Sequence, residues 1–120
     1  QRVAIIRALA NDPEILLMDE PLGALDAQSR LLIQEELLKL WDETKKTVLY
    51  VTHSLDEAIF LADNLVILSN KPTTVQTVMK IDLPRPRNYK MLTTAKAFKY
   101  RKQAMELLHG EAMKSFAVSK

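Results

Sequence analysis

Two adjacent carboxylates, Asp19 and Glu20, directly follow the apolar run Ile15–Met18. Such a run between turn signals predicts a strand buried on both faces of a parallel sheet, and ligands of open parallel sheets bind beyond the carboxyl ends of the strands. Charges at the rim of a buried strand are costly unless a cation or a reaction uses them. A phosphate-bound Mg²⁺ fits: Asp19 would hold the ion or its water, and Glu20 would orient and polarise an attacking water. The alternative is a strand end whose acids simply face solvent.

His53 follows Thr52 at the end of the next predicted strand. Because imidazole changes its protonation near neutral pH, His53 would hydrogen-bond a γ-phosphate or the attacking water beside Glu20. Taken alone, a loop histidine is the better explanation of His53, and capping of the following helix is a sufficient explanation of Asp26. Neighbouring strands would bring Glu20 and His53 together, which favours the functional interpretation.

The strands that would carry these residues are short apolar runs rich in β-branched and aromatic residues between turn signals. A further segment alternates imperfectly and predicts a strand exposed on one side and antiparallel to its neighbour. Together with the helices between them, these strands predict the α/β class. The three apolar runs are residues 15–18, 47–51 and 65–68, and the alternating segment is residues 74–82.

The predicted helices have recognisable caps and apolar stripes. Asp26 would begin a long helix to about Thr44, and Ser54 with Glu57 has the capping-box spacing for a short helix to about Ala62. Two more helices are expected over residues 1–10 and 94–117, separated from the strands by proline-containing turns. The predicted buried stripe of the long helix is Ile33, Leu37, Leu40 and Trp41. The last helix also has an apolar stripe, which could pack on the sheet or contact a second subunit: Phe98, Met105, Leu108, Ala112 and Phe116.

Composition excludes several classes of protein. The chain has 120 residues, 48% hydrophobic and 27% charged, which describes at most one domain. The absence of cysteine excludes disulfides, thiolate metal sites and a cysteine nucleophile. Residues 1–60 hold 6 basic and 11 acidic residues, a balance of −5, whereas residues 61–120 hold 11 and 4, a balance of +7. The basic block 85–102 is expected to be a solvated face, with phosphate, anionic lipid or an acidic partner as the alternative.

Four motifs in this order resemble ATP-binding-cassette (ABC) ATPases. Residues 15–21 look like the Walker B strand, residues 22–26 like the D-loop, and residues 51–54 like the switch-histidine loop, while residues 1–9 are similar to the helix after the family's signature motif. The D-loop variant Pro-Leu-Gly-Ala-Leu-Asp is typical of importers. Residues 63–69 and 82–87 further resemble the nitrate/sulfonate/taurine-type importer branch.

The resemblance implies a partial P-loop NTPase-like sheet with flanking helices, and an ATP- and Mg²⁺-dependent hydrolysis cycle that drives import of a small solute. Asp19 would support Mg²⁺, Glu20 would be the base or water-orienting carboxylate, and His53 would sense the γ-phosphate. Asp26 would lie at the interface of two cassettes that work as a head-to-tail pair. The implied partners are that second ATPase subunit, transmembrane permease subunits and, indirectly, a solute-binding protein, with the cassette peripheral on the cytoplasmic face of the cell membrane.

The sequence also departs from the family. Its two glycines, Gly23 and Gly110, leave no glycine-rich phosphate loop with its lysine. Without backbone N–H groups that cradle the phosphates, tight ATP binding should fail. We therefore expect residues 1–82 to be the carboxyl-terminal half of a cassette core, residues 83–120 to be a basic connector and terminal helix, and the chain to be inactive alone. Its exposed sheet edge and apolar faces would then be covered by other contacts, such as those of a swapped dimer or of aggregation.

Two other functions compete with this interpretation. The first is a non-catalytic interaction or dimerisation module derived from a cassette. The second is a nucleic-acid-binding protein that uses residues 85–102, but this block has only three aromatics and no recognised binding motif, so no specific nucleic acid is expected as a partner.

Overall fold

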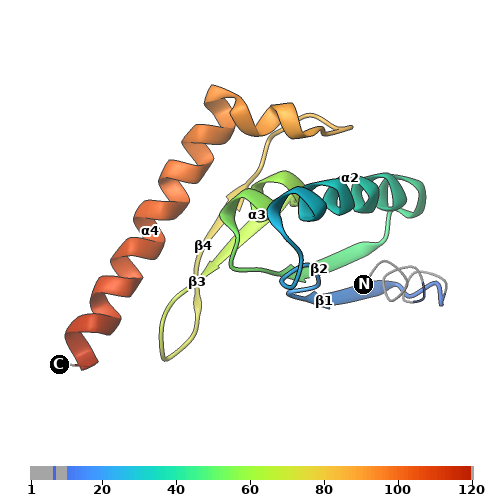
Figure 1. The fold of residues 1–120 in the computed structure, drawn as a ribbon. Coiled ribbons are helices and arrows are strands. Elements are labelled where there is room, and N and C mark those ends of the chain that lie inside the picture. The colour runs from blue at the N-terminus through green and yellow to red at the C-terminus, as the bar shows by residue number, and fades with distance from the viewer. Residues whose placement is uncertain (1–6, 8–10, 120) are drawn as a thin grey trace.

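The computed structural model describes residue 7 and residues 11–119. The helix expected over residues 1–10 therefore lies outside the described residues, apart from Arg7. The elements in chain order, shown in Figure 1, are β1 (Ile15–Asp19), α2 (Ala27–Thr44), β2 (Thr47–Val51), α3 (Leu55–Leu61), β3 (Asn64–Leu68), β4 (Val75–Lys80), the 3₁₀ helix η1 (Tyr89–Thr93) and α4 (Ala95–Ser119). The α/β class and the order of these elements are confirmed.

The four strands form two separate pairs. Strands β1 and β2 are parallel, with Asp19 beside Val51, and β3 and β4 are antiparallel, as expected for the fourth strand. The hairpin between β3 and β4 is closed by the Ser69 N–H, which donates to the Thr74 carbonyl at 2.8 Å. The third strand thus pairs with the hairpin partner that follows it, and the described strands give a mixed α/β arrangement without one continuous P-loop-type sheet.

The prediction that β1 is buried on both faces is wrong for this chain. Leu16 is buried, whereas Ile15 and Leu17 on the opposite face are 61% and 71% exposed. In β2, Leu49 and Val51 are exposed on the same side. The cause is that α2 covers only one face of the β1–β2 pair (Figure 1), and no described element covers the other.

Helix α2 begins and ends as its local chemistry predicts. Asp26 is its N-cap, and the chain leaves the helix at Lys45, which adopts a left-handed φ of 54° and donates its N–H to the Trp41 carbonyl at 2.7 Å. Leu37 of the helix packs against Leu22, and this contact holds the loop after β1 against the helix. Further members of this small core are Met18, Leu25, Ile33 and Tyr50.

A second core joins α3, the β3–β4 hairpin and α4. Its buried residues are Ile59, Ile67, Met79, Ile81, Leu83, Ala97 and Ala104. The buried Arg87 crosses this core and donates hydrogen bonds to backbone carbonyls, among them those of Ala62 at 2.6 Å and Phe60 at 3.1 Å. Burial lowers the pKa of Arg87 to about 10, so the guanidinium stays charged at neutral pH and holds α3 to the connector.

The basic block 85–102 is partly occupied by internal contacts, which its sequence did not predict. Arg85 pairs with Asp63 at 3.0 Å and lies 4.5 Å from the centre of the Trp41 ring. Lys96 pairs with Asp82, and Arg101 pairs with Asp56 of α3. Together with the buried Arg87, four of the seven basic residues in block 85–102 therefore make contacts within the folded chain.

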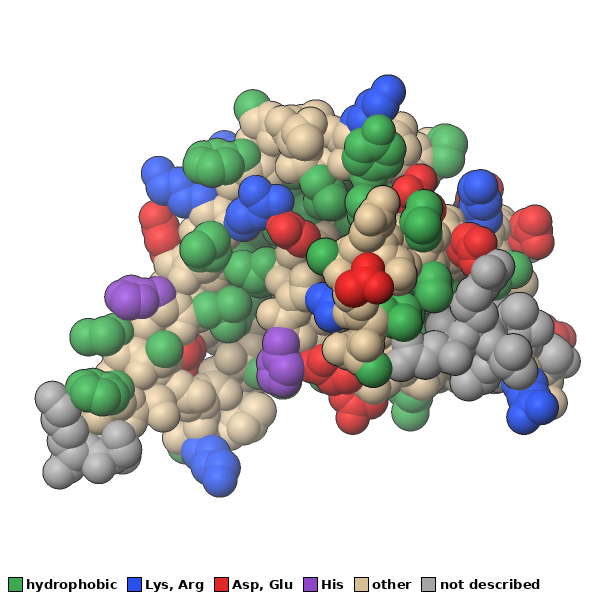
Figure 2. All heavy atoms as spheres, viewed as in Figure 1, with side chains coloured by type: hydrophobic (Ala, Val, Ile, Leu, Met, Phe, Trp, Pro, Cys, Tyr) green, Lys and Arg blue, Asp and Glu red, His purple; other side chains and the backbone are tan. Residues whose placement is uncertain are grey.

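The apolar stripe of α4 faces away from the core. Phe98, Met105, Leu108 and Phe116 are between 40% and 60% exposed, and Figure 2 shows apolar side chains along this helix. The helix instead presents Ala97 and Ala104 to the core, with Tyr100 and Leu107 beside them. Because alanine side chains are small, they allow α4 to approach α3 closely. The alanine face of α4 is therefore buried, and the larger apolar stripe is not. No helix in the described part of the chain has the length and apolar character needed to cross a membrane.

Candidate functional site

The candidate site lies where β1 and β2 end side by side. Because the strands are parallel, their carboxyl ends meet at one edge, and the Glu20 N–H donates to the Val51 carbonyl at 2.8 Å. Glu20 itself has a φ of 51°, in the left-handed region, which costs a non-glycine residue about 1–2 kcal/mol. Its carbonyl accepts the Gly23 N–H at 3.2 Å, so the chain reverses immediately after the strand. This turn directs Glu20 to the end of β2.

Glu20 and His53 are brought together. The His53 Nε2 atom lies 3.1 Å from the Glu20 Oε1 atom, and the imidazole is 95% exposed. Glu20 Oε1 is buried and has no hydrogen-bond partner among the described residues, so the His53 contact is close without being an aligned hydrogen bond. A buried carboxylate oxygen with spare acceptor capacity can receive the proton of a water held beside it.

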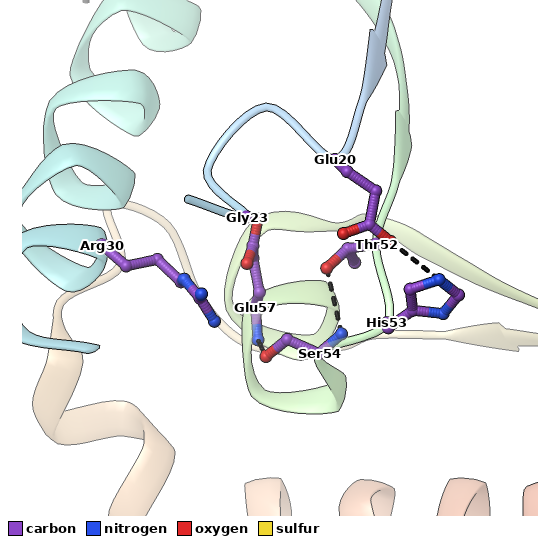
Figure 3. A pocket seen from close by; sticks show the side chains of 7 residues that line it. All are labelled: Glu20, Gly23, Arg30, Thr52, His53, Ser54 and Glu57. Atoms are coloured by element: carbon purple, nitrogen blue, oxygen red, sulfur yellow. Dashed lines mark hydrogen bonds and ion pairs between the residues drawn. The ribbon is translucent and has the colours of Figure 1, made fainter. Parts of the chain in front are cut away.

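These two residues line an open hollow of about 270 Å³ together with five others (Figure 3). Arg30 projects from α2 toward this hollow, and its guanidinium donates to the carbonyls of Leu22 at 3.3 Å and Leu25 at 3.1 Å. It thereby ties the loop after β1 to the helix. The other lining residues are Gly23, Thr52, Ser54 and Glu57.

Ser54 and Glu57 form only half of the expected capping box. The Glu57 N–H donates to Ser54 Oγ at 3.3 Å, but the Ser54 N–H donates to Thr52 Oγ1 at 3.0 Å. The buried Glu57 carboxylate instead accepts the Tyr50 hydroxyl of β2. Burial, with the Glu57 carboxylate beside the hydroxyl, raises the pKa of Tyr50.

Sequence reasoning did not assign Arg30, Tyr50 or Glu57 to the site. The capping-box spacing indicates that Glu57 belongs to the start of a helix, and the β2 pattern indicates that Tyr50 belongs to a strand. Neither pattern predicts a contact between Glu57 and Tyr50. Their contact depends on the turn at residues 52–54, which folds α3 back beside β2.

The other two predicted site residues do not line the hollow. Asp19 is an exposed residue at the end of β1. Asp26 caps α2, with Oδ1 accepting the Ser29 N–H at 2.9 Å and Oδ2 accepting its hydroxyl at 3.0 Å. These hydrogen bonds from Ser29 lower the pKa of Asp26. In the part of the chain that the structure describes, no three His, Asp or Glu side chains are grouped as a metal site.

Comparisons with known proteins give one consistent family. An uncharacterized ABC transporter ATP-binding protein of Methanocaldococcus jannaschii is 53% identical over 115 residues, which cover 96% of this chain and 42% of that protein. The aliphatic sulfonates import ATP-binding protein of Bacillus cereus is 52% identical over 88 residues, 73% of this chain and 35% of that protein. The nitrate import ATP-binding protein of Synechococcus elongatus is 53% identical over 88 residues, 72% of this chain and 32% of that protein.

No protein-family model matches the chain. The chain spans less than half the length of each of these three relatives. The sulfonate and nitrate importers named by the sequence resemblance are both among them. Over the part that it spans, the chain is homologous to the ATP-binding proteins of ABC transporters.

Proposed function

We propose that this chain is part of the ATP-hydrolysing subunit of an ABC importer, in which Glu20 and His53 carry the hydrolytic step. The observation that carries the proposal is the 3.1 Å approach of His53 Nε2 to Glu20 Oε1 at the joined ends of two parallel strands. Neither side chain is needed there for packing, because the imidazole is exposed and the buried Glu20 oxygen has no hydrogen-bond partner among the described residues.

The two side chains have complementary roles in this proposal. Glu20 Oε1 accepts a hydrogen bond from the attacking water and orients it, since an acceptor with spare capacity can hold the water's proton during attack. His53 extends from the end of β2 and donates from its ring to a γ-phosphate oxygen. Their separation of 3.1 Å leaves both within reach of one small ligand at the edge of the hollow.

ATP and Mg²⁺ are the proposed cofactors. Mg²⁺ is usually held through one or two carboxylates together with phosphates and waters. Asp19 is a carboxylate at the end of β1, outside the hollow, and it would hold the ion directly or through a water. When bound, the ion would neutralise charge on the phosphates. Asp26, at the start of α2, would act at the interface of two cassettes while its carboxylate continues to cap the helix.

The proposed partners are a second ATPase subunit arranged head to tail, transmembrane permease subunits and, indirectly, a solute-binding protein. The subunit would be peripheral on the cytoplasmic face of the membrane. Relatives named for sulfonate and nitrate import support a small anionic solute. Because no glycine-rich phosphate loop with its lysine occurs in the sequence, this chain alone is proposed to be inactive.

The catalytic assignment is tested in a full-length protein that contains this chain. We expect Glu20→Gln to keep ATP binding and to lower kcat by about 10²–10⁴-fold, the usual contribution of a positioned acid or base, and His53→Ala to lower kcat as well. His109→Ala, an exposed histidine on α4, is the matched control and should leave kcat unchanged. Normal turnover in Glu20→Gln would remove Glu20 from the catalytic role.

The proposed inactivity of this chain is tested by calorimetry with Mg-ATP, alongside its mass in solution. No binding, together with a dimer or larger species, supports a half-cassette that covers its apolar faces by self-association. Tight binding would contradict the argument from the phosphate loop.

A non-catalytic interaction module is the second candidate function, favoured by the exposed apolar face of β1 and β2. This face comprises Ile15, Leu17, Leu49 and Val51. Exposed apolar patches mark interaction surfaces more often than catalytic ones. Full turnover in both Glu20→Gln and His53→Ala, with stable self-association of the chain, would favour this candidate.

A further inference from the structure

The position of His53 is set by its backbone. Its side chain is 95% exposed, so no packing holds the ring in place beside Glu20. The ring's position therefore follows the turn at residues 52–54, which connects β2 to α3. Whatever fixes this turn also fixes where the His53 side chain starts, and therefore whether its ring can reach Glu20.

A chain of hydrogen bonds fixes the turn to α3. The Ser54 N–H donates to Thr52 Oγ1 at 3.0 Å, and the Ser54 carbonyl accepts the Ala58 N–H at 3.1 Å. The Glu57 N–H donates to Ser54 Oγ at 3.3 Å (Figure 3). These contacts hold residues 52–54 to the first helical turn of α3. None of them connects this segment to the β1–β2 pair.

The connection to the strands is the hydrogen bond between Tyr50 and Glu57. Tyr50 belongs to β2, and its hydroxyl donates to Glu57 Oε1 on α3. The neighbouring Val51 carbonyl accepts the Glu20 N–H at 2.8 Å, so Glu20 is held to the same end of β2. Glu57 is 4% exposed, and a buried carboxylate that loses its donor is costly. This bond therefore joins the part that carries His53 to the part that carries Glu20.

We propose that Tyr50 and Glu57 are positioning residues, whose hydrogen bond holds the turn at residues 52–54 so that His53 stays beside Glu20. This inference rests on the proposed function, because it assigns the pair a role in ATP hydrolysis. It predicts a specific loss of kcat, since a candidate catalytic group that moves by an ångström loses rate without changing how ATP is bound.

The test measures kcat, KM for ATP and thermal stability of the full-length protein. We expect Tyr50→Phe to lower kcat about tenfold, within the range that a 1 Å misplacement produces, with KM unchanged. Glu57→Ala should lower kcat by the same factor. Glu57→Gln should keep most of the wild-type kcat, because its amide oxygen still accepts the Tyr50 hydroxyl.

Two matched controls separate positioning from stability. Tyr100 accepts the Asp82 N–H at 2.9 Å through its hydroxyl, and the buried Glu111 accepts the Asn70 N–H at 2.9 Å. Tyr100→Phe and Glu111→Gln therefore remove or weaken comparable hydrogen bonds away from the hollow. They should lower the melting temperature as much as the site variants do while kcat stays at the wild-type value.

The outcomes distinguish this inference from the proposed function. If Glu20→Gln and His53→Ala abolish turnover but Tyr50→Phe and Glu57→Ala keep wild-type kcat, the positioning role is wrong and the proposed function stands. If Glu20→Gln and His53→Ala also turn over normally, the proposed function fails first. Should Tyr50→Phe not fold, the Glu57 variants carry the test, and equal kcat in Glu57→Ala and Glu57→Gln would overturn the inference.

Discussion

Leu22 and Leu17 provide the sharpest test of the fold, because they flank the same strand end and differ in burial. Leu22 is 0% exposed between β1 and α2, whereas Leu17 is 71% exposed on the open face of β1. We expect Leu22→Ala to lower the free energy of unfolding of this chain by about 3 kcal/mol, toward the lower end for buried leucines because its small core can partly collapse. Full burial of a leucine is worth about 1.5–3 kcal/mol, and less than a third of Leu17 is buried, so Leu17→Ala should cost below about 1 kcal/mol.

Urea unfolding followed by circular dichroism measures this difference. With a slope of about 1–3 kcal/mol/M for a small chain, the Leu22→Ala midpoint should fall by about 1–3 M at unchanged slope. Trp41, the single tryptophan, provides an independent signal from α2. Equal losses in the two variants would refute the one-sided burial of β1.

The same pair tests whether the rest of a full-length protein covers the open face. If it does, Leu17 becomes a core residue there, and Leu17→Ala should cost about 2–4 kcal/mol, as core leucines do. A cost below about 1 kcal/mol in both proteins would contradict coverage of this face.

Three further predictions concern single residues. Gly110→Ala should raise the free energy of unfolding by about 0.5–1 kcal/mol in urea titrations, since an added Cβ meets nothing within 4 Å and alanine favours the helix; a loss of stability would contradict the helical environment of Gly110. Because the folded-state pKa of Tyr50 is raised, its contribution to stability is present below about pH 10 and is lost as pH rises further. Alkaline absorbance titration should detect less tyrosine ionisation in the folded wild type than in the unfolded chain, and an equal difference in Tyr50→Phe would contradict the raised pKa. The pKa of Asp26 is lowered, so its contribution is present above about pH 4 and is lost on acidification; the difference in unfolding free energy between wild type and Asp26→Asn should change as pH falls below about 4, and a constant difference would argue against the ionised cap.

Some errors of the sequence interpretation have one physical cause. A pattern of apolar residues reports which side chains can be buried, but burial also requires a covering element. The run at β1 has the composition of a doubly buried strand, and α2 supplies only one cover in the described structure. The apolar stripe of α4 is likewise uncovered in the described structure, because the helix packs Ala97 and Ala104 against the core.

The candidate site was only partly predictable, because local patterns indicate single strands and helices and not the contacts between them. Glu20 and His53 each follow a recognisable strand, and parallel pairing of those strands brings the two together, as expected. Asp19 was expected beside them, but alternation along the strand places it outside the hollow. Glu57 was visible only as a helix cap, and its bond to Tyr50 joins two elements that no local pattern connects.

The sequence by itself determined the positions of the four strands and of α2, α3 and α4, the caps at Asp26 and Ser54, and the family motifs. All of these depend on residues within a few positions of one another, where periodicity and hydrogen bonding to the nearby backbone decide the outcome. Only the tertiary structure decided which face of each element is buried, that β3 and β4 form a pair separate from β1 and β2, and that the charged Arg87 lies inside a core. These features depend on contacts between distant segments, since the cost of burying a polar group is met only when the folded chain brings its partners to it.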